Sequence, residues 1–165
     1  MDRRKLLAFA AGVAALLMTN AAMASDMAGN VVKDYLAAWN AHDIAKAGSF
    51  FADDVTYYDA SVGTPVTGKD AATTGVVASF INAVPDCKWE MLGDPIVQGD
   101  MVAFQWRFSG TNTGAWGDGT AASGKSFTFM GATVISVKDG KIATQSHYYD
   151  AVSYTHLTLP TNREV

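Results

Sequence analysis

The 165-residue sequence predicts an α+β fold, in which three N-terminal helices wrap one side of a curved antiparallel sheet and enclose a pocket. Two observations predict it. Apolar residues recur at helical spacing in the first half of the chain, and from Cys87 onward apolar and polar residues alternate at strand spacing between turn signals. Aromatic residues make up 11% of the chain, enough to line a pocket and still build a core.

The first 24 residues have the features of a secretory signal peptide. A mostly basic head, Asp2–Lys5, precedes the apolar run Leu6–Met18, which is shorter than the ~20 residues that a membrane-spanning helix needs. Ala22-Met23-Ala24 fits the small-residue cleavage rule, so we expect cleavage after Ala24 and a periplasmic or secreted protein. An uncleaved membrane anchor is the alternative. Residues 25–30 would then be a flexible new N-terminus.

Charge and cysteine content limit the partners of the mature chain. Without residues 1–24 it keeps 9 basic and 15 acidic side chains, a formal charge of −6. An acidic surface with no basic run argues against nucleic acid, and against membranes once the signal peptide is removed. The single cysteine, Cys87, cannot form an internal disulfide, and we expect it to be a small buried apolar residue.

Three helices are predicted before the sheet. The first, Asn30–Asn40, has its apolar residues on one face. Asp43 can cap a second short helix, in which we place Ile44, Phe50 and Phe51 among others. A strand, Val55–Asp59, and a Gly/Pro loop then lead to a third helix, Lys69–Val84, which Pro85 ends.

The rest of the chain is predicted to be β-structure. A first strand begins after Cys87 and is interrupted by a bulge near Gly93-Asp94-Pro95. The strand Met101–Thr111 alternates strictly, and a Gly-rich loop, Gly114–Gly124, follows it. A long hairpin, Lys125–Asp150, turns at Asp139-Gly140 and completes the sheet.

Two residues are candidates for catalysis, His147 and Asp59. An imidazole titrates near neutrality and suits a general acid–base, although a hydrogen-bonded wall residue is the alternative for His147. Alternation predicts that His147 faces the concave side of the sheet with Gln145 and Tyr149, and that Asp150 faces away. Asp59 ends a strand where the mouth of a pocket would lie, and a carboxylate there could act as a base.

Six aromatic residues are candidates for substrate binding, although residues of this type more often build the core. They are Tyr35, Trp39, Tyr57, Trp106, Phe129 and Tyr149. We expect His42 to be structural and Arg107 to pair with an acidic residue across the sheet or at a dimer face. The histidines and carboxylates lack the close spacing of a metal site, so no metal is expected. No nucleophile motif and no phosphate-binding loop is present.

Several segments, in order and spacing, resemble the SnoaL-like polyketide cyclase (ester cyclase) branch of the NTF2-like superfamily over about residues 30–151. They include Trp39-Asn40-Ala41-His42-Asp43, Phe51-Ala52-Asp53-Asp54-Val55, Pro85-Asp86, Ser109–Gly114 and Asp139–Ile142. The resemblance implies an NTF2-like cone with a deep pocket and a homodimer formed through the outer sheet face. It also implies acid–base ring closure by an Asp/His pair, with neither metal nor organic cofactor. Asn112 stands where many relatives have histidine.

The functional hypothesis is an exported domain that binds a small hydrophobic, carbonyl-bearing molecule and catalyses cyclisation, isomerisation or hydrolysis without a cofactor. A non-catalytic binding protein and a dimerisation module with a filled interior are the alternatives. An open pocket reached by both Asp59 and His147 would favour the enzyme, an open apolar pocket the binding protein, and a pocket plugged by Trp and Phe side chains the module.

The C-terminal residues do not read like the rest of the domain. Val152–Thr161 resembles the in-frame translation of a transposase adapter used in sequencing libraries, and Asn162–Val165 can be read as its continuation. We therefore expect residues 152–165 to be a non-native tail, in which His156 has no function. The predicted domain spans residues 25–151, with its native end missing.

Overall fold

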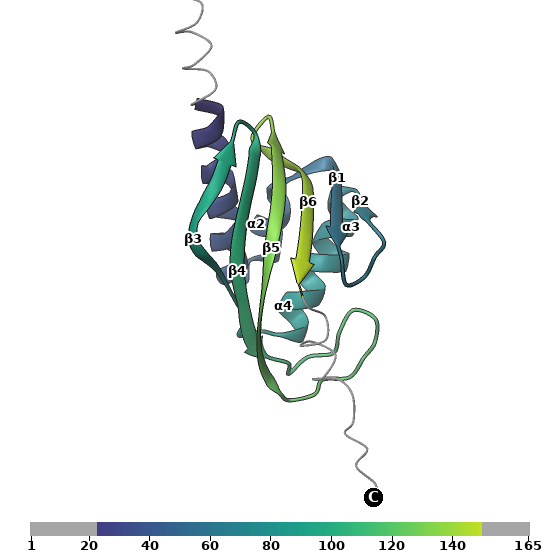
Figure 1. The fold of residues 1–165 in the computed structure, drawn as a ribbon. Coiled ribbons are helices and arrows are strands. Elements are labelled where there is room, and N and C mark those ends of the chain that lie inside the picture. Colours follow the sequence, from purple (N-terminus) through teal and green to yellow (C-terminus); the bar gives the residue numbers. More distant parts are fainter. Residues whose placement is uncertain (1–22, 150–165) are drawn as a thin grey trace, which may run out of the picture.

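The computed structural model describes residues 23–149 (Figure 1). The predictions made for residues 1–22, for Asp150 and for the tail at 152–165 lie outside the described residues and stay predictions.

The fold is α+β, as predicted, with a curved, unclosed sheet of six strands in the order β2-β1-β6-β5-β4-β3 and helices on one face (Figure 1). Four long strands form an antiparallel meander: β3 (Lys88–Gln98), β4 (Met101–Thr111), β5 (Ser126–Lys138) and β6 (Lys141–Tyr149).

The other two strands make the sheet mixed. Strand β1 (Phe51–Asp59) runs parallel to β6, whereas β2 (Val66–Thr67) pairs with β1 in the antiparallel direction. The sequence predicted an antiparallel sheet. The difference arises because β1 pairs with β6, the last strand of the meander. The helices and the other three strands of the meander lie between these two strands in the sequence.

The first helix includes residues 23–40 and therefore begins before Asn30. Residues 25–30, expected to be flexible, belong to it because they pack onto the turn between β3 and β4. The Gly99 N–H donates to Ser25 Oγ at 3.1 Å, and Ala28 is buried. The apolar face predicted for this helix is buried in the core at Val32, Leu36 and Trp39.

The second helix, α2 (Ile44–Ser49), begins as predicted at Asp43, whose side chain accepts a hydrogen bond from the Lys46 N–H at 2.9 Å. It ends earlier than predicted. The Ile142 N–H donates to the Phe50 carbonyl at 2.8 Å, and Phe51 pairs with Ile142 as the first residue of β1. This sheet contact outweighs the helical spacing of Phe50 and Phe51.

The third helical region has three parts: α3 (Lys69–Ala72), the π-helical segment η1 (Thr73–Ala78) and α4 (Ser79–Ala83). The sequence predicted one regular helix here. Two threonine hydroxyls donate to carbonyls one turn back, Thr73 to Lys69 and Thr74 to Asp70, both at 2.7 Å. Such bonds compete with the regular helical ladder, and a wider turn follows.

The sheet confirms several sequence predictions. Val102, Phe104, Trp106 and Phe108 of β4 are buried, and the register of β3 shifts between Leu92 and Ile96, at the predicted bulge. Asp139 and Gly140 both have positive φ, 51° and 72°, as a two-residue hairpin turn requires. Cys87 is buried, and burial raises the pKa of its thiol to about 11.

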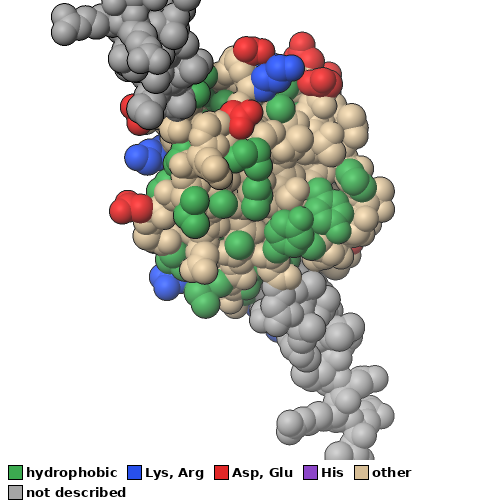
Figure 2. Space-filling view, turned by 45° about the horizontal axis from the view of Figure 1, so that its top comes forward, with side chains coloured by type: hydrophobic (Ala, Val, Ile, Leu, Met, Phe, Trp, Pro, Cys, Tyr) green, Lys and Arg blue, Asp and Glu red, His purple; other side chains and the backbone are tan. Residues whose placement is uncertain are grey.

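The outer face of the sheet, turned away from the helices, is partly apolar. Figure 2 shows hydrophobic side chains gathered on this side, and the exposed ones on the strands are Ile96, Met101, Met130, Val134 and Tyr148. Arg107 Nη1 lies 3.8 Å from Glu90 Oε2 on the neighbouring strand, which confirms the predicted pairing of Arg107 with an acidic residue across the sheet. Among the described helices, none is long and apolar enough to cross a membrane.

Candidate active site

A pocket opens on the concave face of the sheet, and we call it the inner pocket. Its wall is formed by Trp39, Tyr57, Asp59, Phe80, Trp89, Trp106, Phe108, His147 and Tyr149. The space not filled by protein atoms, open mouth included, is about 350 Å³, but only about 30 Å³ can hold the centre of a water-sized sphere. The inner pocket is therefore narrow, with room for about two water-sized groups.

The pairing of β1 with β6 brings Asp59 and His147 together, because they are register partners in the parallel ladder. His147 is 5% exposed and faces inward, whereas Tyr148 is 51% exposed on the other face. The predicted orientation of His147 is thereby confirmed. Its ring lies among three aromatic rings, with centroids 5.2 Å from Tyr57, 5.3 Å from Trp89 and 5.8 Å from Trp106.

Both ring nitrogens of His147 are engaged by buried side chains. Gln145 Nε2 donates to His147 Nε2 at 2.6 Å, which leaves the ring proton on Nδ1, 2.6 Å from Thr133 Oγ1. The same threonine oxygen accepts a hydrogen bond from Trp106 Nε1 at 2.7 Å. His147 is thus held in one orientation, and neither nitrogen offers a free site to a ligand.

Burial makes His147 a neutral side chain at pH 7. It lowers the pKa of the imidazole from 6.5 to about 4, and the negative charge of Asp59 opposes this shift only in part. Burial also raises the pKa of the Tyr57 phenol well above its usual value. Among the described residues, Asp59 is the one carboxylic acid in the wall of the inner pocket.

The Asp59 carboxylate is fixed at the mouth of the inner pocket by three donors. Asp59 Oδ1 accepts hydrogen bonds from the Ser61 N–H at 2.8 Å and from the Ser61 hydroxyl at 2.6 Å. Asp59 Oδ2 accepts one from the Tyr149 hydroxyl at 2.9 Å. A carboxylate has about four acceptor positions, so it can still accept a proton or a hydrogen bond from a ligand.

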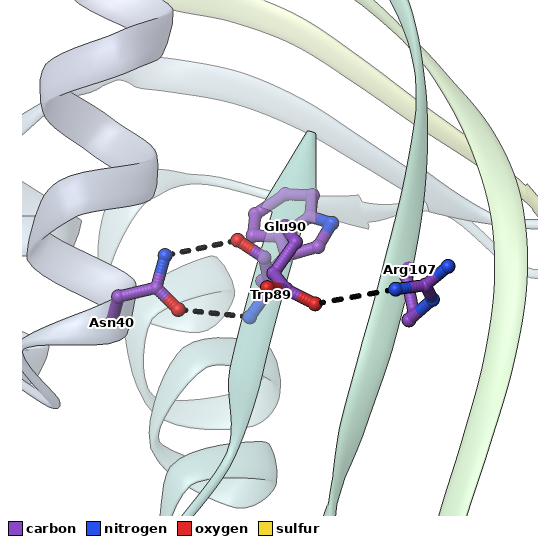
Figure 3. Close-up of polar contacts among 4 residues, drawn as sticks. All are labelled: Asn40, Trp89, Glu90 and Arg107. Atoms are coloured by element: carbon purple, nitrogen blue, oxygen red, sulfur yellow. Dashed lines mark hydrogen bonds and ion pairs between the residues drawn. The ribbon is translucent and has the colours of Figure 1, made fainter. Parts of the chain in front are cut away.

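Trp89 is positioned from the opposite side by Asn40, the last residue of the first helix. Asn40 Nδ2 donates to the Trp89 carbonyl at 2.9 Å, and the Trp89 N–H donates to Asn40 Oδ1 at 2.8 Å (Figure 3). These two bonds tie the edge strand β3 to the helix and hold the indole against the inner pocket. The indole N–H of Trp89 is buried, with no acceptor among the described residues.

Six of the eight predicted site residues lie in this wall: Trp39, Tyr57, Asp59, Trp106, His147 and Tyr149. Tyr35 and Phe129 do not, which corrects that part of the prediction. Tyr35 is fully buried behind the wall, with ring centroids 5.5 Å from Phe51 and 5.9 Å from Trp89. Phe129 lies behind Tyr149, with the two ring centroids 5.0 Å apart.

Sequence reasoning missed three wall residues, Phe80, Trp89 and Phe108, and the two buried partners of His147, Thr133 and Gln145. Alternation along β3 to β5 could have placed Trp89, Phe108 and Thr133 on the concave face, where it had already placed Gln145. Two other expectations concern histidine and metal. His42 has a structural role, since its Nε2 donates to the Cys87 carbonyl at 2.8 Å. Within residues 23–149, no group of three acidic, histidine or cysteine side chains could hold a metal ion.

A family model identifies the family of the chain, and solved structures show its fold. The SnoaL-like domain family matches residues 32–145. Among solved structures, a protein from Jannaschia assigned to the SnoaL-like polyketide cyclases has a TM-score of 0.71 at 17% identity, covering 81% of this chain and 92% of its own. IdmH from Streptomyces antibioticus, assigned as a polyketide cyclase, has a TM-score of 0.64 at 20% identity, with coverages of 79% and 96%.

A third similar structure, of ketosteroid isomerase-like fold from Catenulispora acidiphila, was solved in complex with trimethylamine. Its TM-score is 0.65 at 23% identity, and the match covers 82% of this chain and 97% of that one. At these identities the likeness shows the fold alone. No curated protein sequence matches the chain significantly.

Proposed function

The chain belongs to the SnoaL-like domain family, and on that basis we propose that it binds a small, mostly apolar, carbonyl-bearing molecule in the inner pocket and moves a proton on it without a cofactor. One observation carries the proposal. Asp59 and His147 come from paired strands to the same pocket, where every other wall residue is aromatic.

Asp59 is the group that we assign as the base. Its carboxylate takes a proton from the carbon next to the ligand carbonyl, and the electron pair of the broken C–H bond moves onto the carbonyl oxygen as an enolate. We assign the buried indole N–H of Trp89, which has no acceptor among the described residues, as the donor to that oxygen. If the enolate is conjugated with a C=C bond of the ligand, return of the proton from Asp59 to the far carbon of that system gives an isomer. If the enolate carbon attacks a second carbonyl of the same ligand, a C–C bond closes a ring and the new alkoxide takes the proton from Asp59.

His147 is neutral in this scheme. Its depressed pKa means that it carries no proton to give up as a cationic acid at pH 7, and both of its nitrogens are occupied. It closes the back of the inner pocket and keeps the Asp59 charge facing apolar rings. To act as the predicted partner of Asp59, it would have to exchange Gln145 or Thr133 for the ligand.

The same two features of His147 also support the second candidate, a non-catalytic binding protein that uses the inner pocket. The narrowness of that pocket supports a third, a module whose interior is filled by aromatic rings. Native mass spectrometry of the protein exposed to an extract of its host separates the two ligand-binding candidates from the filled module. We expect a bound carbonyl compound that excess butan-2-one displaces. An extract from which the protein retains no small molecule would contradict the proposal.

Export and dimer formation are further parts of the proposal. The N-terminal pattern supports export to the periplasm or the medium, which N-terminal sequencing of the mature protein would test by finding Ser25 first. The exposed apolar side chains of the outer sheet face support a homodimer formed through that face. Light scattering of the wild type and of Val134→Lys tests it, because a charge in the interface should shift the mass towards a monomer.

A further inference from the structure

A second cavity, which we call the outer groove, adjoins the mouth of the inner pocket. Asp59, Phe80 and Tyr149 line both cavities, so these three side chains form a neck between them. The outer groove extends from the neck to Gly75 of η1 and to Trp116 and Asp118 of the Gly-rich loop. Its volume for the centres of water-sized spheres is about 390 Å³, against about 30 Å³ in the inner pocket.

The loop wall of the outer groove is held firmly in place. Asn112 is buried and anchors the loop at three points, because its Nδ2 donates to the carbonyls of Ala83 and Gly114, at 3.0 and 2.8 Å, and its Oδ1 accepts from the Ser123 N–H at 2.7 Å. The Trp116 ring packs edge-on against Phe80, with the centroids 5.5 Å apart. The groove is therefore formed before any ligand arrives.

The helical wall of the outer groove has a gap at Gly75. A Cβ built on Gly75 would meet no atom within 4 Å, so a longer side chain there has free space to project into the groove. Gly75 has an ordinary φ, in contrast to the other glycines with free space around a Cβ. A substitution at Gly75 can thus fill the groove without straining the backbone.

The charges around the outer groove have one sign. Asp59 and Asp118 lie in its wall, and no lysine, arginine or histidine is among the described residues that line it. Its largest side chains are aromatic: Phe80, Trp116 and Tyr149. Such a surface accepts apolar or positively charged groups and repels anions.

We infer that the inner pocket and the outer groove form one two-chamber site for an elongated ligand. The slender carbonyl end enters the inner pocket through the neck, and the body of the ligand, apolar and either uncharged or cationic, lies in the outer groove. The inference rests on the proposed function, because it names the class of ligand for the same site.

Methyl ketones of increasing length, from butan-2-one to decan-2-one, test the inference by their dissociation constants for the wild type, Gly75→Ala and Gly75→Leu. Each added methylene that reaches the outer groove should tighten binding about fourfold. Gly75→Ala, the matched control for the backbone change, should keep this gain. Gly75→Leu should remove the gain for the long ketones and leave the dissociation constant of butan-2-one unchanged.

A charged probe tests the second part of the inference. The anion 7-oxooctanoate should bind at least about fivefold more weakly than octan-2-one, as expected for like charges at contact distance in water. Butan-2-one binding without any gain from length, equal weakening of short and long ketones by Gly75→Leu, or tighter binding of the anion would each overturn the two-chamber site alone. Failure of every ketone to bind would overturn the proposed function, and this inference with it.

Discussion

Replacing Thr133 by valine should destabilise the domain by about 2–4 kcal/mol. Thr133 is fully buried, and its hydroxyl oxygen lies 2.7 Å from Trp106 Nε1 and 2.6 Å from His147 Nδ1. Valine has nearly the same shape, so the substitution leaves two buried donors without an acceptor, at about 1–3 kcal/mol each. The prediction of about 2–4 kcal/mol takes the lower part of the summed cost of the two donors. The reason is that valine, unlike threonine, has no hydroxyl group that loses its hydration on folding.

Urea unfolding of the wild type, Thr133→Val and Thr144→Val measures the effect. Thr144→Val is the matched control, because Thr144 bonds to Ser136 at 2.7 Å on the exposed face of the same pair of strands. Its free energy of unfolding should change by no more than about 0.5 kcal/mol. If the two variants lose equal stability, the buried network around His147 does not hold the pocket in the way described.

Three other predictions concern stability. Because burial lowers the pKa of His147 from 6.5 to about 4, the unfolded chain binds more protons between these pH values, and stability should fall by up to about 3 kcal/mol as the pH drops through this window. Urea titrations at pH 7 and pH 4 should show a smaller loss in His147→Gln; equal losses would contradict it. Gly131→Ala should cost about 1–3 kcal/mol in the same assay, because the new Cβ overlaps the Trp106 ring and lies 2.7 Å from the Tyr148 carbonyl oxygen; an unchanged midpoint would show that the ring moves freely. Deletion of residues 152–165 should leave stability within about 0.5 kcal/mol, and a larger loss would mean that the tail is part of the domain.

The fold followed from local patterns wherever short-range chemistry decides the structure. The Asp43 cap, the Asp139-Gly140 turn and the alternation of β4 each depend on neighbouring residues, and all three are confirmed. Phe51 and the parallel β1–β6 pair depend instead on contacts between distant parts of the chain. No local pattern in the sequence specifies that long-range pairing, and it overrode the helical spacing of Phe50 and Phe51.

The candidate site was predictable to a similar depth. Strand alternation was sufficient to turn His147 inward, and the end of a strand placed Asp59 at the mouth of the inner pocket. Strand alternation could not separate Trp106, which lines the inner pocket, from Phe129, which lies behind the wall. Nor could alternation show that Thr133 and Gln145 occupy both nitrogens of His147, because that depends on the register of β5 against β6.

The most direct test of the central claim is the rate at which the protein exchanges the α-protons of butan-2-one for deuterium, followed by NMR in D₂O. If the Asp59 carboxylate removes such a proton, the wild type should accelerate exchange above the buffer rate. Asp59→Asn, which keeps the shape of the side chain and removes the base, should lower the rate by about 10²–10⁴-fold. Exchange at the buffer rate with the wild type, or equal rates for the two proteins, would contradict the claim that Asp59 moves a proton on a carbonyl-bearing ligand.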